Sequence, residues 1–250
     1  MVPPLHLCLD DLTEDPALDT AVARVILERV DAGELPATLR LSRPPRVVAF
    51  SRRDARSPGF ARAVAGARAT GFDAVLRLAG GRAAVFHEGT IAFAWAVPAT
   101  DPIDGITARF RTMATALATA FQRLGVDARI GEVPGEYCAG RWSVNVAGRR
   151  KLAGVGQRVV RRAAHTGGVV VVDDAAAVIR ALTPVYAAFE LDWDPAATGA
   201  LADEAALTWE GTRTAIAEVF AEQHDVRPWR LDAPTLVRAR AIADEHRVEG

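Results

Sequence analysis

Two residues in the middle of the chain, Cys138 and Lys151, have side chains that could carry out covalent chemistry together. Cys138 lies in the loop sequence GEVPGEYCAGR, where Gly135 and Gly140 leave room for a substrate at the sulfur. A strand-like segment and a Gly-Arg turn separate it from Lys151, so the two side chains can face each other across a loop. A nearby ammonium favours the thiolate, the nucleophilic form of cysteine. The spacing therefore favours a nucleophilic cysteine with a cationic neighbour.

The alternative is that Cys138 is a packing residue. Buried structural cysteines usually lie on an apolar periodic face, which describes Cys8 in LHLCLDD but not Cys138. We expect Cys8 to be inert. Two cysteines make no disulfide framework, and this predicts a protein of the reducing cytoplasm.

Lys151 is the only lysine in a chain that contains 29 arginines. An ammonium is a compact point charge that fits a narrow site, whereas arginine presents a planar fork. The retention of one lysine therefore marks position 151 as a candidate catalytic site. The chance survival of one surface lysine would explain the count equally well.

A second candidate site is the glycine loop RLAGGRAAVFHEG, residues 77–89. Gly80 and Gly81 lie between two strand-like runs, where they allow close approach of the backbone to a ligand, and their N–H groups can bind a carbonyl or an anion. A plain hairpin turn is the other interpretation of a glycine pair.

The remaining composition excludes several classes of protein. The formal net charge of −1 argues against a dedicated binder of nucleic acid or membrane surfaces. The N-terminal sequence lacks the pattern of a signal peptide, and the apolar runs are too short to span a bilayer. The five histidines are scattered, so no metal site is expected.

Hydrophobic periodicity predicts both helices and strands. The helices are expected at residues 16–30 (with Thr13 and Asp15 as cap candidates), 60–69, 105–124, 202–222 and 234–246. The strands are expected at residues 38–41, 47–51, 74–78, 83–87, 91–97, 143–147, 152–160 and 165–172. Strands that arrive in runs, interrupted by a few long helices, predict an α+β fold with a mixed or antiparallel sheet packed with helices. We expect residues 1–183 to form the catalytic domain and residues 184–250 a short helical C-terminal extension of the same unit.

The two candidate sites together resemble the biotin/lipoate protein ligase and octanoyltransferase superfamily. Its Arg-x-x-Gly-Gly loop and its lysine segment are matched here by Arg77, Gly80, Gly81, Gly148, Lys151, Leu152, Ala153, Gly154 and Gln157, with one extra residue between Gly148 and Lys151. The branch of octanoyl-[glycine cleavage H protein]:protein N-octanoyltransferases has a Gly-Glu-Val-Pro-Gly-x-Tyr-Cys-x-Gly loop, which this chain has at residues 131–140. The likeness covers residues 38–172, and the cysteine loop is its specific part.

The resemblance implies a biotin/lipoate ligase catalytic-domain fold and an acyl transfer in two steps. Cys138 would take an octanoyl or lipoyl group from a donor as a thioester, and a lysine of a lipoyl-type carrier domain would then accept it as an amide. Lys151 would lower the pKa of Cys138 and donate to the acyl oxygen. The substrate residues implied are Arg77, Gly80, Gly81, Arg82, Ala83, His87, Gly89, Ala153, Gly154 and Gln157, with Val85 and Phe93 beside the acyl tail.

No cofactor is implied by this resemblance. The implied partners are the glycine cleavage H protein, the E2 component of 2-oxoacid dehydrogenases, or an acyl carrier protein. Arg82 departs from the transferase pattern, which has an apolar residue there, and this departure leaves the acyl group open.

Two other functions fit the same fold. An ATP-dependent lipoate or biotin ligase would use Lys151 to bind an acyl-adenylate. However, ligases often have Arg-Arg at the Arg77-Leu78 position and an Asn-Asp pair where this chain has residues 143–145. A non-catalytic acyl-binding protein is the third possibility, because a fold does not fix a function. The sole lysine and the cysteine loop argue against it.

Overall fold

The main sheet of the protein has eight strands, and a smaller sheet of three strands lies beside it. The structure, a computed structural model, describes residues 3–12 and 15–249. The strands of the main sheet follow the order β11-β1-β2-β6-β10-β9-β8-β7. Their bounds are β1 Pro4–Cys8, β2 Ala37–Ser42, β6 Thr90–Pro98, β7 Ala128–Ile130, β8 Val144–Val146, β9 Arg150–Val159, β10 Ala163–Val171 and β11 Asp225–Pro228. The smaller sheet has the order β4-β3-β5, with β3 Val47–Phe50, β4 Asp73–Leu76 and β5 Ala84–Phe86.

Both sheets are mixed. In the main sheet β1 pairs in parallel with β2 and β11, whereas the strands from β2 through β6, β10, β9 and β8 to β7 pair antiparallel. In the smaller sheet β3 is parallel to β4 and antiparallel to β5. These pairings confirm the predicted α+β class with a mixed sheet.

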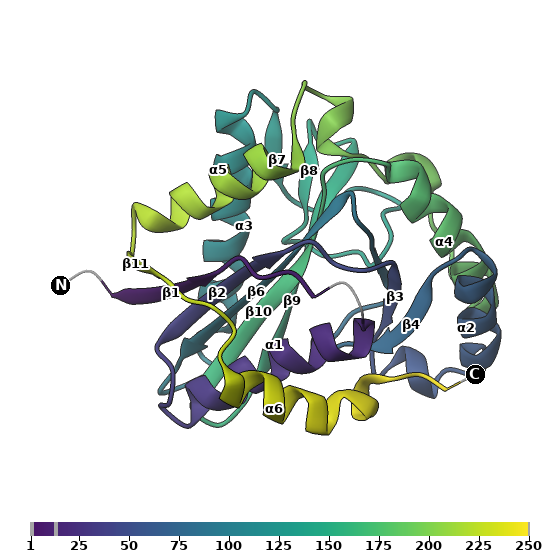
Figure 1. Ribbon diagram of the computed structural model, residues 1–250. Coiled ribbons are helices and arrows are strands. Elements are labelled where there is room, and N and C mark those ends of the chain that lie inside the picture. The colour runs from purple at the N-terminus through teal and green to yellow at the C-terminus, as the bar shows by residue number, and fades with distance from the viewer. Residues whose placement is uncertain (1–2, 13–14, 250) are drawn as a thin grey trace.

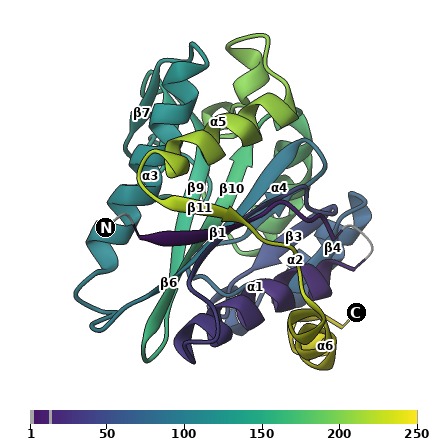
Figure 2. The same ribbon diagram turned by 60° about the vertical axis from the view of Figure 1, so that its left-hand side comes forward.

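Three pairs of helices cover the sheets (Figures 1 and 2). Helix α3 (Ile106–Arg123) lies beside α5 (Trp209–Ala221), α1 (Pro16–Asp31) lies beside α6 (Ala233–Ile242), and α2 (Phe60–Ala69) lies beside α4 (Ala175–Ala188). Each pair encloses a separate part of the hydrophobic core. None of the helices in the described part of the chain is both long and apolar enough to cross a membrane.

The helices with strong periodicity lie where the sequence predicts them. The predictions at residues 16–30, 60–69 and 105–124 are confirmed to within one residue at each end by α1, α2 and α3. The Asp15 side chain caps α1 by accepting a hydrogen bond from the Ala17 N–H at 2.9 Å, whereas Thr13 lies outside the described residues. Gly125 follows α3 with a φ of +87°, a conformation that glycine adopts without strain.

The C-terminal part differs more from the prediction. A single helix at residues 202–222 is wrong, because Leu201–Asp203 form a short 3-10 helix and α5 begins only after the Thr208 cap. The tail is not helical throughout, since β11 adds a strand to the main sheet. The expected boundary between residues 183 and 184 falls inside α4, which contains Pro184. Gly66 of α2 allows close packing there, because a Cβ on Gly66 would lie 2.9 Å from the Pro184 Cβ.

Candidate active site

The cysteine loop, residues 131–143, connects β7 to β8, and buried polar side chains hold it in place. The carboxylate of Glu136, which is 5% exposed, accepts hydrogen bonds from the Gly140 N–H at 2.9 Å and the Ser143 hydroxyl at 2.6 Å. Cys138 has a φ of +44°, an uncommon backbone conformation for a residue other than glycine. Its N–H donates to the hydroxyl oxygen of Tyr186 on α4 at 2.7 Å. These contacts fix the strained turn that presents the Cys138 side chain.

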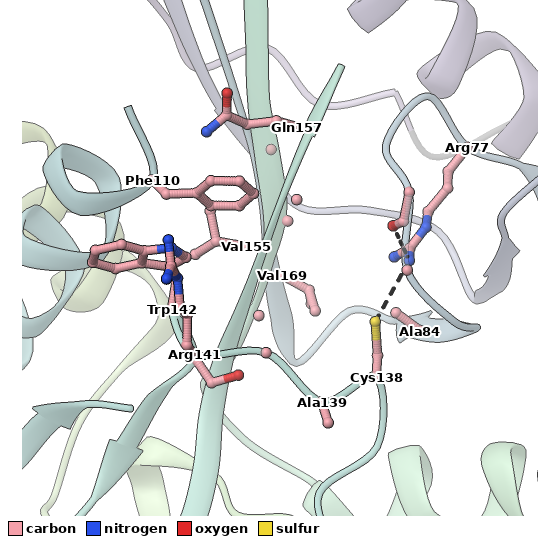
Figure 3. A pocket seen from close by; sticks show the side chains of 18 of the residues that line it. Arg77, Ala84, Phe110, Cys138, Ala139, Arg141, Trp142, Val155, Gln157 and Val169 are labelled. Atoms are coloured by element: carbon pink, nitrogen blue, oxygen red, sulfur yellow. Dashed lines mark hydrogen bonds between the residues drawn. The ribbon is translucent and has the colours of Figure 1, made fainter. Parts of the chain in front are cut away.

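The Cys138 sulfur is in contact with the glycine loop. The backbone N–H of Arg82 donates to Sγ at 3.2 Å, and Nη2 of the Arg77 guanidinium lies 3.6 Å from it (Figure 3). The same Nη2 donates to the carbonyls of Gly80 and Arg82 at 2.6 and 2.7 Å, so Arg77 closes the loop on itself. The structure thus brings together two segments that lie about 60 residues apart in the sequence.

Lys151 lies on β9 and is 1% exposed. Its Nζ donates to the carbonyls of Tyr137 at 2.9 Å and Cys138 at 3.0 Å, and lies 3.4 Å from Oε1 of Glu136. The three contacts use all three donors of an ammonium group. Lys151 therefore binds the backbone of the cysteine loop, and it lines the same cavity as Cys138.

The positive charges of Arg77 and Lys151 lower the pKa of the Cys138 thiol. Burial of the Cys138 thiol raises its pKa, but the Arg77 guanidinium, the Lys151 ammonium and the Arg82 N–H outweigh burial, and the pKa lies below that of a free cysteine. Arg77 is the strongest of the three. For Cys8 the balance is reversed, because burial dominates and raises the pKa of its thiol. Cys138 is therefore the more nucleophilic of the two cysteines at neutral pH.

Cys138 and Lys151 line a cavity of about 510 Å³. Figure 3 shows Cys138 and Arg77 on one side of it, and Phe110, Trp142 and Gln157 on the other, with Val155 and Val169 between them. The floor is formed by glycines of β9 and β10. A cavity of this size, mostly apolar and with a few polar groups in its wall, fits a small acyl group.

A family model described as the lipoyl protein ligase A/B catalytic domain matches residues 15–190, well over half of the chain. The chain belongs to this family. Two curated relatives, both named "Octanoyl-[GcvH]:protein N-octanoyltransferase", are from Geobacillus kaustophilus and Anoxybacillus flavithermus. The first is 29% identical over 163 residues, which cover 65% of this chain and 54% of the relative. The second is 30% identical over 146 residues, which cover 58% and 50%. The chain thus spans about half the length of the curated relatives it matches.

Solved structures of lipoate ligases share the fold of this lipoyl protein ligase A/B domain. A lipoate-protein ligase A bound with ATP superimposes with a TM-score of 0.79 at 20% identity, covering 97% of this chain and 95% of that chain. The bipartite lipoate protein ligase of Thermoplasma acidophilum gives a TM-score of 0.75 at 19% identity, covering 97% and 93%. These neighbours confirm the fold that the resemblance implied.

Only some of the expected substrate residues of this family member line the cavity. Arg77, Gly80, Gly81, Gly154 and Gln157 do so. Gln157 uses both ends of its amide for structure, since its oxygen accepts from Arg109 at 3.1 Å and its nitrogen donates to the Ile106 carbonyl at 2.8 Å. Gly154 leaves space beside the lysine, because a Cβ there would lie 3.2 Å from Cε and 3.4 Å from Nζ of Lys151.

The other expected residues lie around the cavity rather than in its wall. Ala83 and Ala153 are fully buried, and the Ala83 carbonyl lies 3.4 Å from the Tyr186 hydroxyl. His87 is 1% exposed, and its Nδ1 accepts from the Gly89 N–H at 3.1 Å, so these two residues form a turn. Val85 points into the core, because the alternation of β5 turns Ala84 and Phe86 to the cavity instead.

Arg82 contributes its backbone and not its side chain. The guanidinium extends away from the sulfur to Asp54, which is fully buried, with an Nη1–Oδ1 distance of 3.2 Å. The departure from an apolar residue at position 82 therefore leaves the cavity itself unchanged.

Sequence reasoning did not find Glu136, Tyr186 and Tyr137 as site residues. The face of the Tyr137 ring makes a cation–π contact with Lys151, with 4.7 Å between Nζ and the ring centroid. Tyr137 is a defined residue of the cysteine-loop motif, which was the available signal, whereas Glu136 occupies a position that the motif leaves open. Tyr186 lies on α4, 48 residues after Cys138, and nothing in the sequence connects it to the loop. In the described part of the chain no group of three or more His, Cys, Asp or Glu side chains could hold a metal ion.

The contact at Gly81 gives a prediction. Gly81 has a φ of +98°, and a Cβ there would lie 2.7 Å from the Cys138 Sγ and 2.8 Å from the Arg77 Nη2. We expect Gly81→Ala to lower the alkylation rate of Cys138 by iodoacetamide about tenfold or more, because it strains the turn and displaces the sulfur from its partners. Gly80→Ala is the matched control, since a Cβ there meets open space. Equal rates for the two variants would contradict this interpretation of the turn.

Proposed function

We propose that this chain is an acyltransferase of protein lipoylation that carries an octanoyl or lipoyl group on Cys138. The observation that supports it most is the contact of a low-pKa cysteine with Arg77 and the Arg82 N–H at the wall of the cavity that Lys151 also lines. The curated relatives, which bear the name of octanoyltransferases over about half their length, support the same conclusion.

In the first step the Cys138 thiolate attacks the carbonyl carbon of an acyl-lysine amide on a donor carrier domain. The C–S bond forms, the C–N bond breaks, and the departing lysine amine takes up a proton from the solvent, to which the attacking amine of the second step returns one. The Arg82 N–H and the Lys151 ammonium are donors near the developing oxyanion. Lys151 can exchange its longest contact, 3.4 Å to Glu136, for the acyl oxygen across the bare backbone of Gly154.

In the second step the amine of an acceptor lysine attacks the thioester. The C–N bond forms, the C–S bond breaks, and the thiolate is regenerated next to Arg77. Because one lysine amide replaces another, the overall reaction needs no ATP. The mostly apolar cavity restricts water, which would otherwise hydrolyse the thioester. Burial of the acyl tail stabilises the complex by about 0.8 kcal/mol for each CH₂ group.

The partners that we propose are lipoyl-type carrier domains, with the glycine cleavage H protein as donor and an E2 lipoyl domain as acceptor. The rim of the cavity suits an acidic partner, since the guanidinium carbons of Arg111 and Arg141 lie 5.9 and 5.3 Å from the centroid of the Trp142 ring. Such a reaction belongs in the cytoplasm, where the thiols of Cys138 and Cys8 stay reduced.

The function can be tested by incubating the protein with an octanoylated H protein and an unmodified E2 lipoyl domain in the absence of nucleotide. We expect mass spectrometry to show the octanoyl group on the acceptor lysine. A parallel reaction contains free octanoate and Mg-ATP in place of the octanoylated donor. Acylation of the acceptor in that reaction alone would overturn the transferase proposal in favour of an ATP-dependent ligase.

A further inference from the structure

A second, smaller chamber of about 100 Å³ adjoins the cavity of Cys138. It lies among α1, β2, β6, β10 and the start of the glycine loop. The two spaces share four wall residues, Arg77, Phe86, Gly167 and Gly168. Arg77 is also the residue whose guanidinium contacts the Cys138 sulfur. The chamber therefore begins one side chain away from the proposed nucleophile.

Two consecutive glycines of β10, Gly167 and Gly168, are part of the wall that the two spaces share. A Cβ on Gly168 would lie 1.9 Å from the backbone oxygen of Gly154, and one on Gly167 would lie 2.4 Å from Nε2 of His165. Both are closer than real Cβ atoms come to other atoms. Gly167, which shares a face of β10 with His165, therefore leaves room for that ring in the wall of the second chamber.

Two buried polar side chains of β2 are part of the mostly apolar wall of this chamber. Arg40 is 2% exposed, and its Nη2 donates to Oδ1 of Asp19 at 2.7 Å. Ser42, on the same strand, is 1% exposed. The apolar part of the wall includes Phe86, Leu78 and the alanines at 23, 79, 92 and 94. A chamber that received only the methyl end of an alkyl chain would gain nothing from buried polar groups, because their desolvation costs free energy.

His165 provides the decisive feature of this wall. It is 6% exposed, and among residues 3–12 and 15–249 its buried Nδ1 has no hydrogen-bond partner. Burial lowers the pKa of His165 to about 4, so the ring is neutral at physiological pH and has one donor and one acceptor nitrogen. The Nε of Arg77, another wall residue, is likewise buried without a partner in the described part of the chain.

We propose that the second chamber receives the far end of the acyl chain and selects a chain that carries a hydrogen-bonding heteroatom there, such as a terminal hydroxyl. The proposal rests on the function proposed above and specifies its substrate class. A hydroxyl both donates and accepts, so it satisfies a neutral imidazole, whereas a methyl group leaves the buried polar atoms unpaired. A site built to bond a polar substrate group discriminates against the analogue that lacks it.

The proposal is tested first by binding, which does not depend on transfer. The affinities of octanoate and 8-hydroxyoctanoate for the Cys138→Ser protein are measured by calorimetry, with and without the additional change His165→Leu. We expect the hydroxy acid to bind about tenfold more tightly when His165 is present, and His165→Leu to reverse the preference. His224→Leu, outside the chamber, is the matched control and should leave the ratio unchanged.

Two further measurements keep the test decisive. If His165→Leu fails to fold, His165→Gln replaces it, and we expect this variant to keep the preference for the hydroxy acid because it keeps both hydrogen-bonding functions. Equal binding of the two acids to the His165 protein, or tighter binding of octanoate, overturns the proposal. The same acyl chains are then compared as donors on a carrier domain. If the binding ratio is as expected but neither acyl chain is transferred, the proposed specificity of the chamber is supported and the proposed transferase function is overturned.

Discussion

Replacing Lys151 with methionine is expected to lower kcat/KM for acyl transfer by about a thousandfold and the free energy of unfolding by about 3 kcal/mol. The loss of activity follows from the removal of an ammonium that holds the Cys138 carbonyl at 3.0 Å and helps to lower the pKa of the thiol. The loss of stability follows from Glu136, whose buried carboxylate then lacks its cation. Single-turnover kinetics and urea denaturation measure the two effects.

The double variant Lys151→Met/Glu136→Gln separates these effects. The neutral glutamine oxygen still accepts from the Gly140 N–H and the Ser143 hydroxyl, so we expect most of the stability to return. We expect the activity to stay low, because the cation is still missing. If the double variant regained transfer together with stability, Lys151 would be only a structural residue.

Replacing Arg77 with leucine has the second-largest expected effect. The guanidinium is the strongest group that lowers the pKa of Cys138, and the pKa of this acidic group rises when the cation is removed. At pH 7 the thiolate fraction then falls, and the alkylation rate should decrease about tenfold for each unit by which the pKa rises. The rate should recover at alkaline pH, because the thiolate forms there without assistance. The measurement is the rate of iodoacetamide modification of Cys138 between pH 5 and 10.

Arg77→Lys is the conservative comparison for this profile. A lysine keeps the charge but lacks the fork that also binds the carbonyls of Gly80 and Arg82. We expect its midpoint to lie between those of the wild type and Arg77→Leu. Coincident profiles of the wild type and Arg77→Leu would show that Arg77 does not activate the thiol.

Several features of the fold and the site could be predicted because local patterns determine them. The apolar repeat from Ile106 to Leu124 specifies α3, and Gly125 ends it. The cysteine loop and the lysine segment are adjacent in the sequence, so their meeting follows from one short hairpin. The contact of the lysine with the loop is therefore accessible to reasoning from spacing.

The features that were missed depend on contacts between distant segments. The strand β1 pairs in parallel with β2 and with β11, which lies more than 200 residues away, and no local pattern reports such pairing. The role of Arg82 depends on its backbone N–H, which is independent of residue type. Tyr186 acts from α4, where Pro184 obscured the helix in the sequence. The sequence analysis interpreted the Arg82 side chain as a determinant of the acyl group, whereas the structure shows this side chain bonded to Asp54.

The most direct measurement is peptide mass spectrometry of the protein after brief incubation with an octanoylated carrier domain at neutral pH. We expect a hydroxylamine-labile octanoyl group on the peptide that contains Cys138, and none on the peptide of Cys8, whose thiol is buried and has a raised pKa. The Cys138→Ser protein should neither retain such an adduct nor transfer the acyl group. Full transfer activity of Cys138→Ser, or a stable octanoyl amide on Lys151, would contradict a thioester on Cys138 as the intermediate.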